Sequence, residues 1–168
     1  MLAGCLLFFG CEETTRTPTT LPAKTTDDDA AKPPPMLRKN NFSNLDSLLT
    51  VGQKLNVDAF NKSIIVADDA KDDWVFSPFL IALQYTSDQL ESASKKIEVV
   101  AAGPESQDEI IVTITEDGLL DDAMKGTLTI LKLLRKDKLW QIEKAGQLWE
   151  CWPGRNEGKQ GFSTEPCG

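Results

Sequence analysis

The sequence predicts an α+β fold, with an N-terminal helical portion packed on one face of a curved antiparallel sheet of four or five strands. Before Pro78, apolar residues recur at three-and-four spacing, as they do on one face of a helix. After Pro78 they alternate with polar residues or form short continuous runs, as they do in strands. The connections between these later segments are short, and short connections require antiparallel pairing.

Two helices are predicted before Pro78. Asn44 can cap a segment that Gly52 ends. Residues 57–72 form the second helix, because their apolar side chains follow one stripe that can be buried on a sheet. Pro78 is expected to end the helical portion, since proline cannot continue a helix. The apolar positions are Leu45, Leu48 and Leu49 in the first helix, and Val57, Phe60, Ile64 and Ala67 in the second, with Trp74 continuing its spacing.

Strands are predicted at residues 79–85, 96–101, 109–115 and 127–134, and a fifth begins near Trp140. In the third, Ile110, Val112 and Ile114 share one face. Turn residues separate the runs: Gly103-Pro104, Asp117-Gly118, Gly126 and the turn at 136–138. The element order is similar to that of cystatin-like and NTF2-like folds.

Composition divides the 168-residue chain into three parts. Residues 1–11 form an apolar leader, residues 12–40 a disordered linker and residues 41–168 a single domain. The segment 12–39 holds seven threonines and five of the nine prolines. Such a stretch buries too little apolar surface to offset the entropy of ordering it. The domain is long enough for one modest core.

The leader is too short to span a bilayer and turns abruptly polar at Glu12. It resembles a bacterial lipoprotein signal, in which a small residue precedes a cysteine that becomes lipid-modified. Cys11 is favoured because the apolar run stops there. Cys5 is its rival, because Leu2-Ala3-Gly4-Cys5 matches the lipobox. The basic residues that usually open such a signal are missing, which leaves open a start codon upstream.

Charge and composition exclude several classes of function. The net charge of −8 falls on the domain, because the linker carries equal numbers of acidic and basic residues. An acidic domain is repelled by phosphate backbones, so we expect no nucleic-acid partner. The chain contains no histidine, which rules out His-based acid–base catalysis and His-ligated metals. We predict no catalytic, cofactor-binding or metal site, and no cofactor.

Cys151 and Cys167 are predicted to form a disulfide. They bracket a segment rich in glycine and proline, with little apolar content beyond Trp152 and Phe162, that would fray in water. Closing the loop would stabilise it, and a disulfide fits the oxidising compartment to which the leader points. The alternatives are a thiol nucleophile or a two-cysteine metal site, for which neither a partner base nor further ligands are evident.

The segment 117–167 is similar to a family of uncharacterised bacterial exported and lipoprotein domains. That family has no assigned activity, so the resemblance implies a cellular location and a fold more than a function. Its tail often reads Gly-Arg-Gly-His-Gln, whereas residues 154–160 here lack the imidazole. The matching residues are Asp117-Gly118, Asp121-Asp122, Gly126, Trp140, Cys151, Gly154-Arg155, Phe162-Ser163 and Cys167.

Other clusters allow a functional and a structural interpretation. Trp140, Trp149 and Trp152 could form a carbohydrate or peptide platform, but we expect Trp140 in the core and the other two to pack the sheet's end against the tail. The acidic clusters at 68–73 and 116–122 could suggest calcium or glycosidase chemistry. We expect a solvated helix face for the first and a loop for the second. Arg155 could bind a carboxylate or phosphate, but an intramolecular salt bridge is expected.

Together these features favour a lipid-anchored, extracytoplasmic cell-envelope domain that acts as a non-enzymatic protein-binding or structural module. Its partners would be the membrane, through the lipid, and an envelope protein. The alternative is an extracytoplasmic domain with a small-ligand pocket between helix and sheet, which could include a hydrolase using acidic residues.

Overall fold

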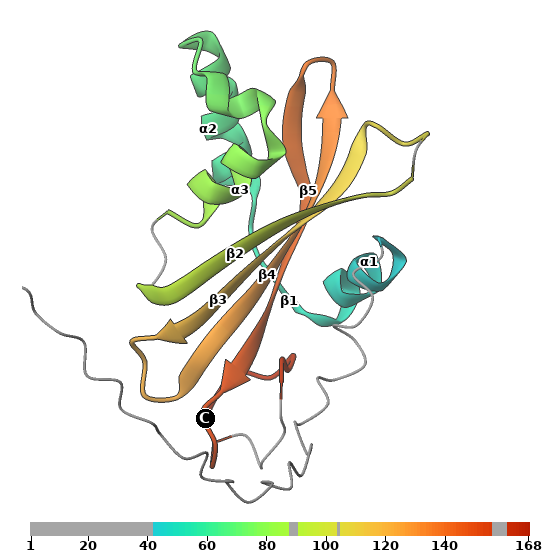
Figure 1. Cartoon of the computed structure of the whole chain (residues 1–168). Helices are drawn as coiled ribbons and strands as arrows, with labels where there is room; N and C mark the ends of the chain where they lie inside the picture. The colour runs from blue at the N-terminus through green and yellow to red at the C-terminus, as the bar shows by residue number, and fades with distance from the viewer. Residues whose placement is uncertain (1–41, 88–90, 104, 156–160) are drawn as a thin grey trace, which may run out of the picture. The chain divides into compact units, whose positions relative to one another are not determined.

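The computed structural model describes residues 42–87, 91–103, 105–155 and 161–168. The leader and the linker, with Cys5 and Cys11, lie outside the described residues. Within them the helices come first and the long strands follow (Figure 1). The elements are α1 (Phe42–Val51), β1 (Gln53–Lys54), α2 (Asp58–Asp69), the 3-10 helix η2 (Asp73–Phe76), α3 (Pro78–Tyr85), β2 (Ser92–Ala101), β3 (Glu109–Leu119), β4 (Met124–Lys136) and β5 (Leu139–Cys151).

The strands form one antiparallel sheet in the order β1-β5-β4-β3-β2. The predicted α+β class is therefore confirmed. Pairing of Lys136 with Leu139 leaves a two-residue turn between β4 and β5. Asp137 in that turn has a φ of 57°, a left-handed conformation that aspartate tolerates better than most residues.

A β-bulge in β5 shifts which residues face which side of the sheet. Lys132 pairs with Lys144 and Leu133 with Ile142, so Glu143 is the extra residue. Next to the bulge, the Asn61 side chain of α2 donates to the Ile142 carbonyl (2.8 Å) and accepts from its N–H (2.9 Å). These two hydrogen bonds, between the Asn61 side-chain amide and the Ile142 backbone, fix α2 on β5.

The sheet is covered on both faces, which corrects the expectation that the helices pack on one face only (Figure 1). α2, η2 and α3 cover one side. Phe60 contacts Trp74 and Tyr85 there, with ring centroids 6.0 and 5.0 Å apart, and so joins all three helices. α1 covers the other side, where its three leucines pack on the sheet. The sheet residues in that second cluster are Ile111, Leu128, Ile130 and Leu148.

The prediction of a strand at residues 79–85 was wrong, because this run forms helix α3. Pro78 begins the helix instead of ending one. Proline suits the first helical turn, where its missing N–H has no intrahelical partner to lose. Ser77 caps the helix by accepting a hydrogen bond from the Leu80 N–H at 3.4 Å. A short apolar run has no period that separates strand from buried helix.

Other boundaries also differ from the sequence prediction. α2 ends at Asp69, and a left-handed Lys71 (φ 65°) follows before the separate helix η2. β2 begins at Ser92 and β3 runs to Leu119, so both strands are longer than predicted. No local pattern predicts β1, a pair of exposed polar residues that bonds to the edge of β5 at Gly146 and Gln147.

Candidate functional site

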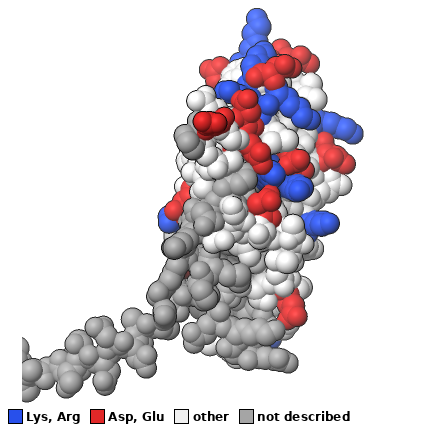
Figure 2. Space-filling view, turned by 90° about the vertical axis from the view of Figure 1, so that its right-hand side faces the viewer, with Lys and Arg blue, Asp and Glu red and all other residues white. Residues whose placement is uncertain are grey.

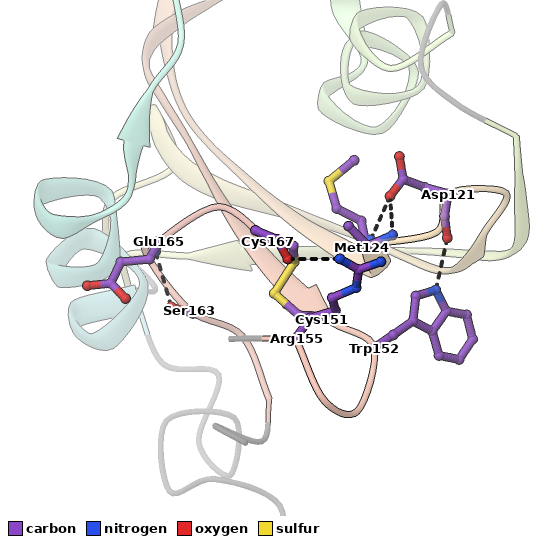
Figure 3. The surroundings of a disulfide bond; sticks show 10 residues. Asp121, Met124, Cys151, Trp152, Arg155, Ser163, Glu165 and Cys167 are labelled. Atoms are coloured by element: carbon purple, nitrogen blue, oxygen red, sulfur yellow. Dashed lines mark hydrogen bonds between the residues drawn. A yellow bond between two sulfur atoms is a disulfide. The ribbon is translucent and has the colours of Figure 1, made fainter. Parts of the chain in front are cut away.

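The structure joins Cys151 to Cys167 by a disulfide, with Cα atoms 5.5 Å apart (Figure 3). Cys151 is the last residue of β5, so the bond ties the chain's last residues to the end of the central sheet. Disulfides persist in oxidising compartments and are rare in the cytosol. The bond is therefore consistent with an extracytoplasmic location.

The tail inside the disulfide loop extends the edge of β5. The Trp149 N–H donates to the Ser163 carbonyl (2.9 Å) and the Ser163 N–H to the Trp149 carbonyl (2.7 Å). Phe162 packs against the α1 cluster, where Leu148 also lies. Successive strand residues face opposite sides, so the Trp149 side chain lies on the other face. Phe162 therefore packs on the sheet face opposite the Trp149 side chain.

Trp152 is held against the loop between β3 and β4. Its indole Nε1 donates to the Asp121 carbonyl at 2.9 Å and its backbone N–H to the Ala123 carbonyl at 3.0 Å (Figure 3). Trp152 is 38% exposed. The carboxylate of Asp121 accepts hydrogen bonds from the Met124 and Ala123 N–H groups (2.7 and 2.8 Å), and these bonds lower its pKa. The Asp121 side chain thus stabilises its own loop by binding backbone N–H groups, as expected for an aspartate in a turn.

Arg155 contacts groups of its own chain. Its guanidinium lies 3.8 Å from the Asp122 carboxylate and donates to the Gly168 carbonyl at 3.5 Å. Both side chains of the ion pair are well exposed, and exposed pairs contribute little stability. The intramolecular salt bridge expected for Arg155 is therefore present.

The three tryptophans of the C-terminal part form no common platform. Trp140 and Trp149 are buried, whereas Trp152 is partly exposed. Trp140 belongs to the core on the α2 side, as expected. The Arg135 guanidinium lies 5.6 Å from its ring and also binds Asp108 at 2.6 Å.

The first acidic cluster behaves as a solvated helix end, with Asp68 paired to Lys138 at 3.0 Å. The second cluster divides: Glu116 and Asp117 belong to β3, not to a loop, whereas Asp121 and Asp122 lie in the loop. Among the described residues, no group of three or more Cys, Asp and Glu side chains is placed to hold a metal ion.

An ion pair with a buried carboxylate, which the sequence does not predict, links α3 to the sheet. Glu116 is 1% exposed, and its Oε1 lies 2.9 Å from the Lys95 ammonium. Thr127 donates to the other carboxylate oxygen at 3.2 Å. Lys95 also donates to the carbonyl and hydroxyl oxygens of Thr86, directly after α3 (3.2 and 3.3 Å). Both carboxylate oxygens are thus engaged within the protein.

Charges of both signs interleave on the α1 side of the molecule, as the upper part of Figure 2 shows. Lys132 of β4 lies 2.7 Å from Glu109, 3.3 Å from Asp46 and 3.5 Å from Glu143. Its pKa is raised, first by the hydrogen bond to Glu109 and then, against desolvation, by Asp46. These contacts fasten α1 to three strands.

The outer surface of η2 and α3 is apolar, and we call it the α3 stripe. Its members are each between 37% and 47% exposed, although the opposite side of α3 is fully buried through Ile81 and Ala82. Within α3, Leu83 lies three and four residues from Leu80 and Phe79, so these three side chains share one side of the helix. Phe76 ends η2, and the extended Ser77 separates it from α3. The α3 stripe consists of Phe76, Phe79, Leu80 and Leu83.

No helix in the described part of the chain is long and apolar enough to cross a membrane. Comparisons with protein families, with characterised proteins and with solved structures find no match to this chain. The resemblance of residues 117–167 to exported bacterial domains stays a prediction.

We predict that Cys167→Ala lowers the free energy of unfolding by roughly 2 to 4 kcal/mol, because it frees a tail that the bond closes. The fold should persist, since the long strands and the helices of the described residues lie outside the loop. Chemical denaturation of the oxidised wild type and of the variant measures the difference.

Ser163→Ala is the matched control. It removes a hydroxyl that accepts one exposed hydrogen bond, from the Glu165 N–H at 3.1 Å, but keeps the backbone pairing to Trp149, so its stability should change little. Equal stability of the oxidised wild type and Cys167→Ala would show that the bond does not stabilise the domain.

Proposed function

We propose that this chain is a non-enzymatic protein-binding module of the cell envelope, exported and held at a membrane by lipid on Cys11. The α3 stripe carries the proposal. Monomeric soluble proteins rarely leave large apolar side chains grouped on one surface unless that surface binds something. Three such residues at helical spacing on α3, with Phe76 at the end of η2, offer a partner apolar side chains to contact.

The α3 stripe is supported by a rigid base. The inner side of α3 is buried in the core, its start is capped by Ser77, and Lys95 holds its last turn through Thr86. A helix fixed in this way loses little conformational freedom on binding, which favours affinity. We infer that the partner is an envelope protein presenting an apolar groove or helix face.

Two features support the proposed lipid anchor: the leader sequence, and a disulfide that suits an oxidising compartment. An apolar leader that ends at Cys11 is typical of a lipoprotein signal, and the linker of residues 12–40 would give the domain reach from the bilayer. The Cys151–Cys167 disulfide agrees with a location outside the cytoplasm.

The alternative, a small-ligand domain or hydrolase using acidic residues, draws less support. Such chemistry needs carboxylates turned toward a ligand. Glu116 is instead paired with Lys95 and Thr127, and Asp121 caps its own loop. We therefore favour the binding module.

Polar substitution of the α3 stripe should abolish partner capture. The double variant Leu80→Gln, Leu83→Gln keeps good helix formers at exposed positions, so stability should change by less than about 1 kcal/mol. Chemical crosslinking in the intact envelope, followed by purification of the chain, measures recovery of the wild-type partner.

The control is Ile65→Gln, Val66→Gln, which alters two exposed apolar residues of α2 outside the stripe. It should recover the partner as wild type does. Recovery of the same partner by the Leu80, Leu83 variant would contradict the proposed surface.

Membrane attachment should depend on Cys11. Cys11→Ser should move the protein from the membrane fraction to the soluble fraction, because the acyl chains that anchor it are lost. Cys5→Ser should fractionate as wild type does; release by Cys5→Ser alone would assign the lipid to Cys5 instead. Membrane retention of the Cys5→Ser, Cys11→Ser double variant would overturn the anchor.

A further inference from the structure

Strand β2 is the last strand of the sheet, and among the described residues no strand pairs with its outer edge (Figure 1). The opposite margin differs, because β1 and Ser163 pair along β5. β2 has ten residues, long for an open edge. Proteins usually shorten, twist, cover or charge such an edge, because its unpaired N–H and C=O groups can bind another strand.

The hydrogen-bond pattern shows which residues present these groups. The Ala102 N–H donates to the Glu109 carbonyl at 3.4 Å, and the Arg135 N–H to the Asp108 carbonyl at 2.8 Å. In antiparallel sheets the residues of a strand alternate between its two neighbours. These two bonds show that the even-numbered residues from Ser94 to Val100 direct their backbone N–H and C=O groups toward β3. The outer edge presents the backbone groups of Lys95, Ile97 and Val99.

The charges on β2 complement themselves across a twofold axis. Lys96 and Glu98 share one face and lie 3.0 Å apart within the strand. If a second copy pairs antiparallel with Ile97 opposite Ile97, Lys96 of each copy faces Glu98 of the other. A shift of the centre by one residue sets Lys96 against Lys96, or Glu98 against Glu98, and like charges directly opposite destabilise a sheet.

We propose that this edge is a self-association site, at which two copies of the chain pair through β2 and join their two five-stranded sheets into one continuous sheet. The residues at the centre suit the role. In this register Lys96 and Glu98 occupy the positions without backbone hydrogen bonds, where side chains approach most closely. On the other face Ile97 meets its counterpart, and Val99, now 49% exposed, lies opposite the second copy's Lys95. This inference does not depend on the proposed function.

Charge reversal tests the pairing directly. Lys96→Glu sets a new carboxylate of one copy against Glu98 of the other, and Glu98→Lys creates the corresponding contacts between two ammonium groups. Each variant, as full oxidised chain, should weaken association roughly tenfold or more in analytical ultracentrifugation, because two opposite-charge pairs become two like-charge pairs.

An equimolar mixture of the two variants should associate again, because each strand then meets its charge complement twice. Mixing cannot repair a folding defect, so this recovery separates pairing from stability. The controls Lys62→Glu and Asp69→Lys make the same changes of net charge at exposed positions on α2, away from β2, and should associate as wild type does. The proposal would be overturned if the wild type stayed monomeric at all concentrations, or if the mixture of the two variants stayed monomeric. It would also be overturned if a different protein were found paired to β2.

Discussion

The central strands are apolar on both faces, and this constraint organises the domain. In β3 and β4, neighbouring residues such as Ile110 and Ile111, or Ile130 and Leu131, are all buried although they point to opposite sides. Neither face can therefore be left to water. α1 covers one face, and α2, η2 and α3 cover the other. The chain passes from the α1 layer to the α2 layer through β1. Because β1 is an edge strand, this passage does not interrupt the core.

One row of the sheet carries a charged pair. Lys95, Glu116 and Thr127 lie opposite one another on β2, β3 and β4, in register. Taking the Glu116 carboxylate out of water is costly, and pairing it with the partly exposed Lys95 offsets that cost without a large net gain in stability. Its geometry is specific, however, because Lys95 reaches Thr86 directly after α3. The row thus fixes where α3 ends on the sheet, and with it the base of the α3 stripe.

Strand alternation and cysteine spacing are readable from the sequence, whereas several tertiary features are not. Ile110, Val112 and Ile114 predict β3, and the apolar Ile111 between them is the local sign that both faces of the strand are buried. The same alternation extends to Glu116, whose burial follows only once its partners on other strands are known. The expectation for Pro78 was wrong because proline both ends and begins helices. β1 and the position of Phe162 depend on contacts that no local pattern encodes.

The measurement closest to the central constraint is native-state hydrogen exchange of Leu48→Ala, which loosens the α1 face alone. Leu48→Ala should lower the free energy of global unfolding, measured with denaturant, by roughly 2 to 5 kcal/mol. Because both helical layers bury one sheet, the free energy of exchange of the slowest amides in α2, β3 and β4 should fall by the same amount. Faster exchange confined to α1, with wild-type protection in α2 and the sheet, would contradict the account.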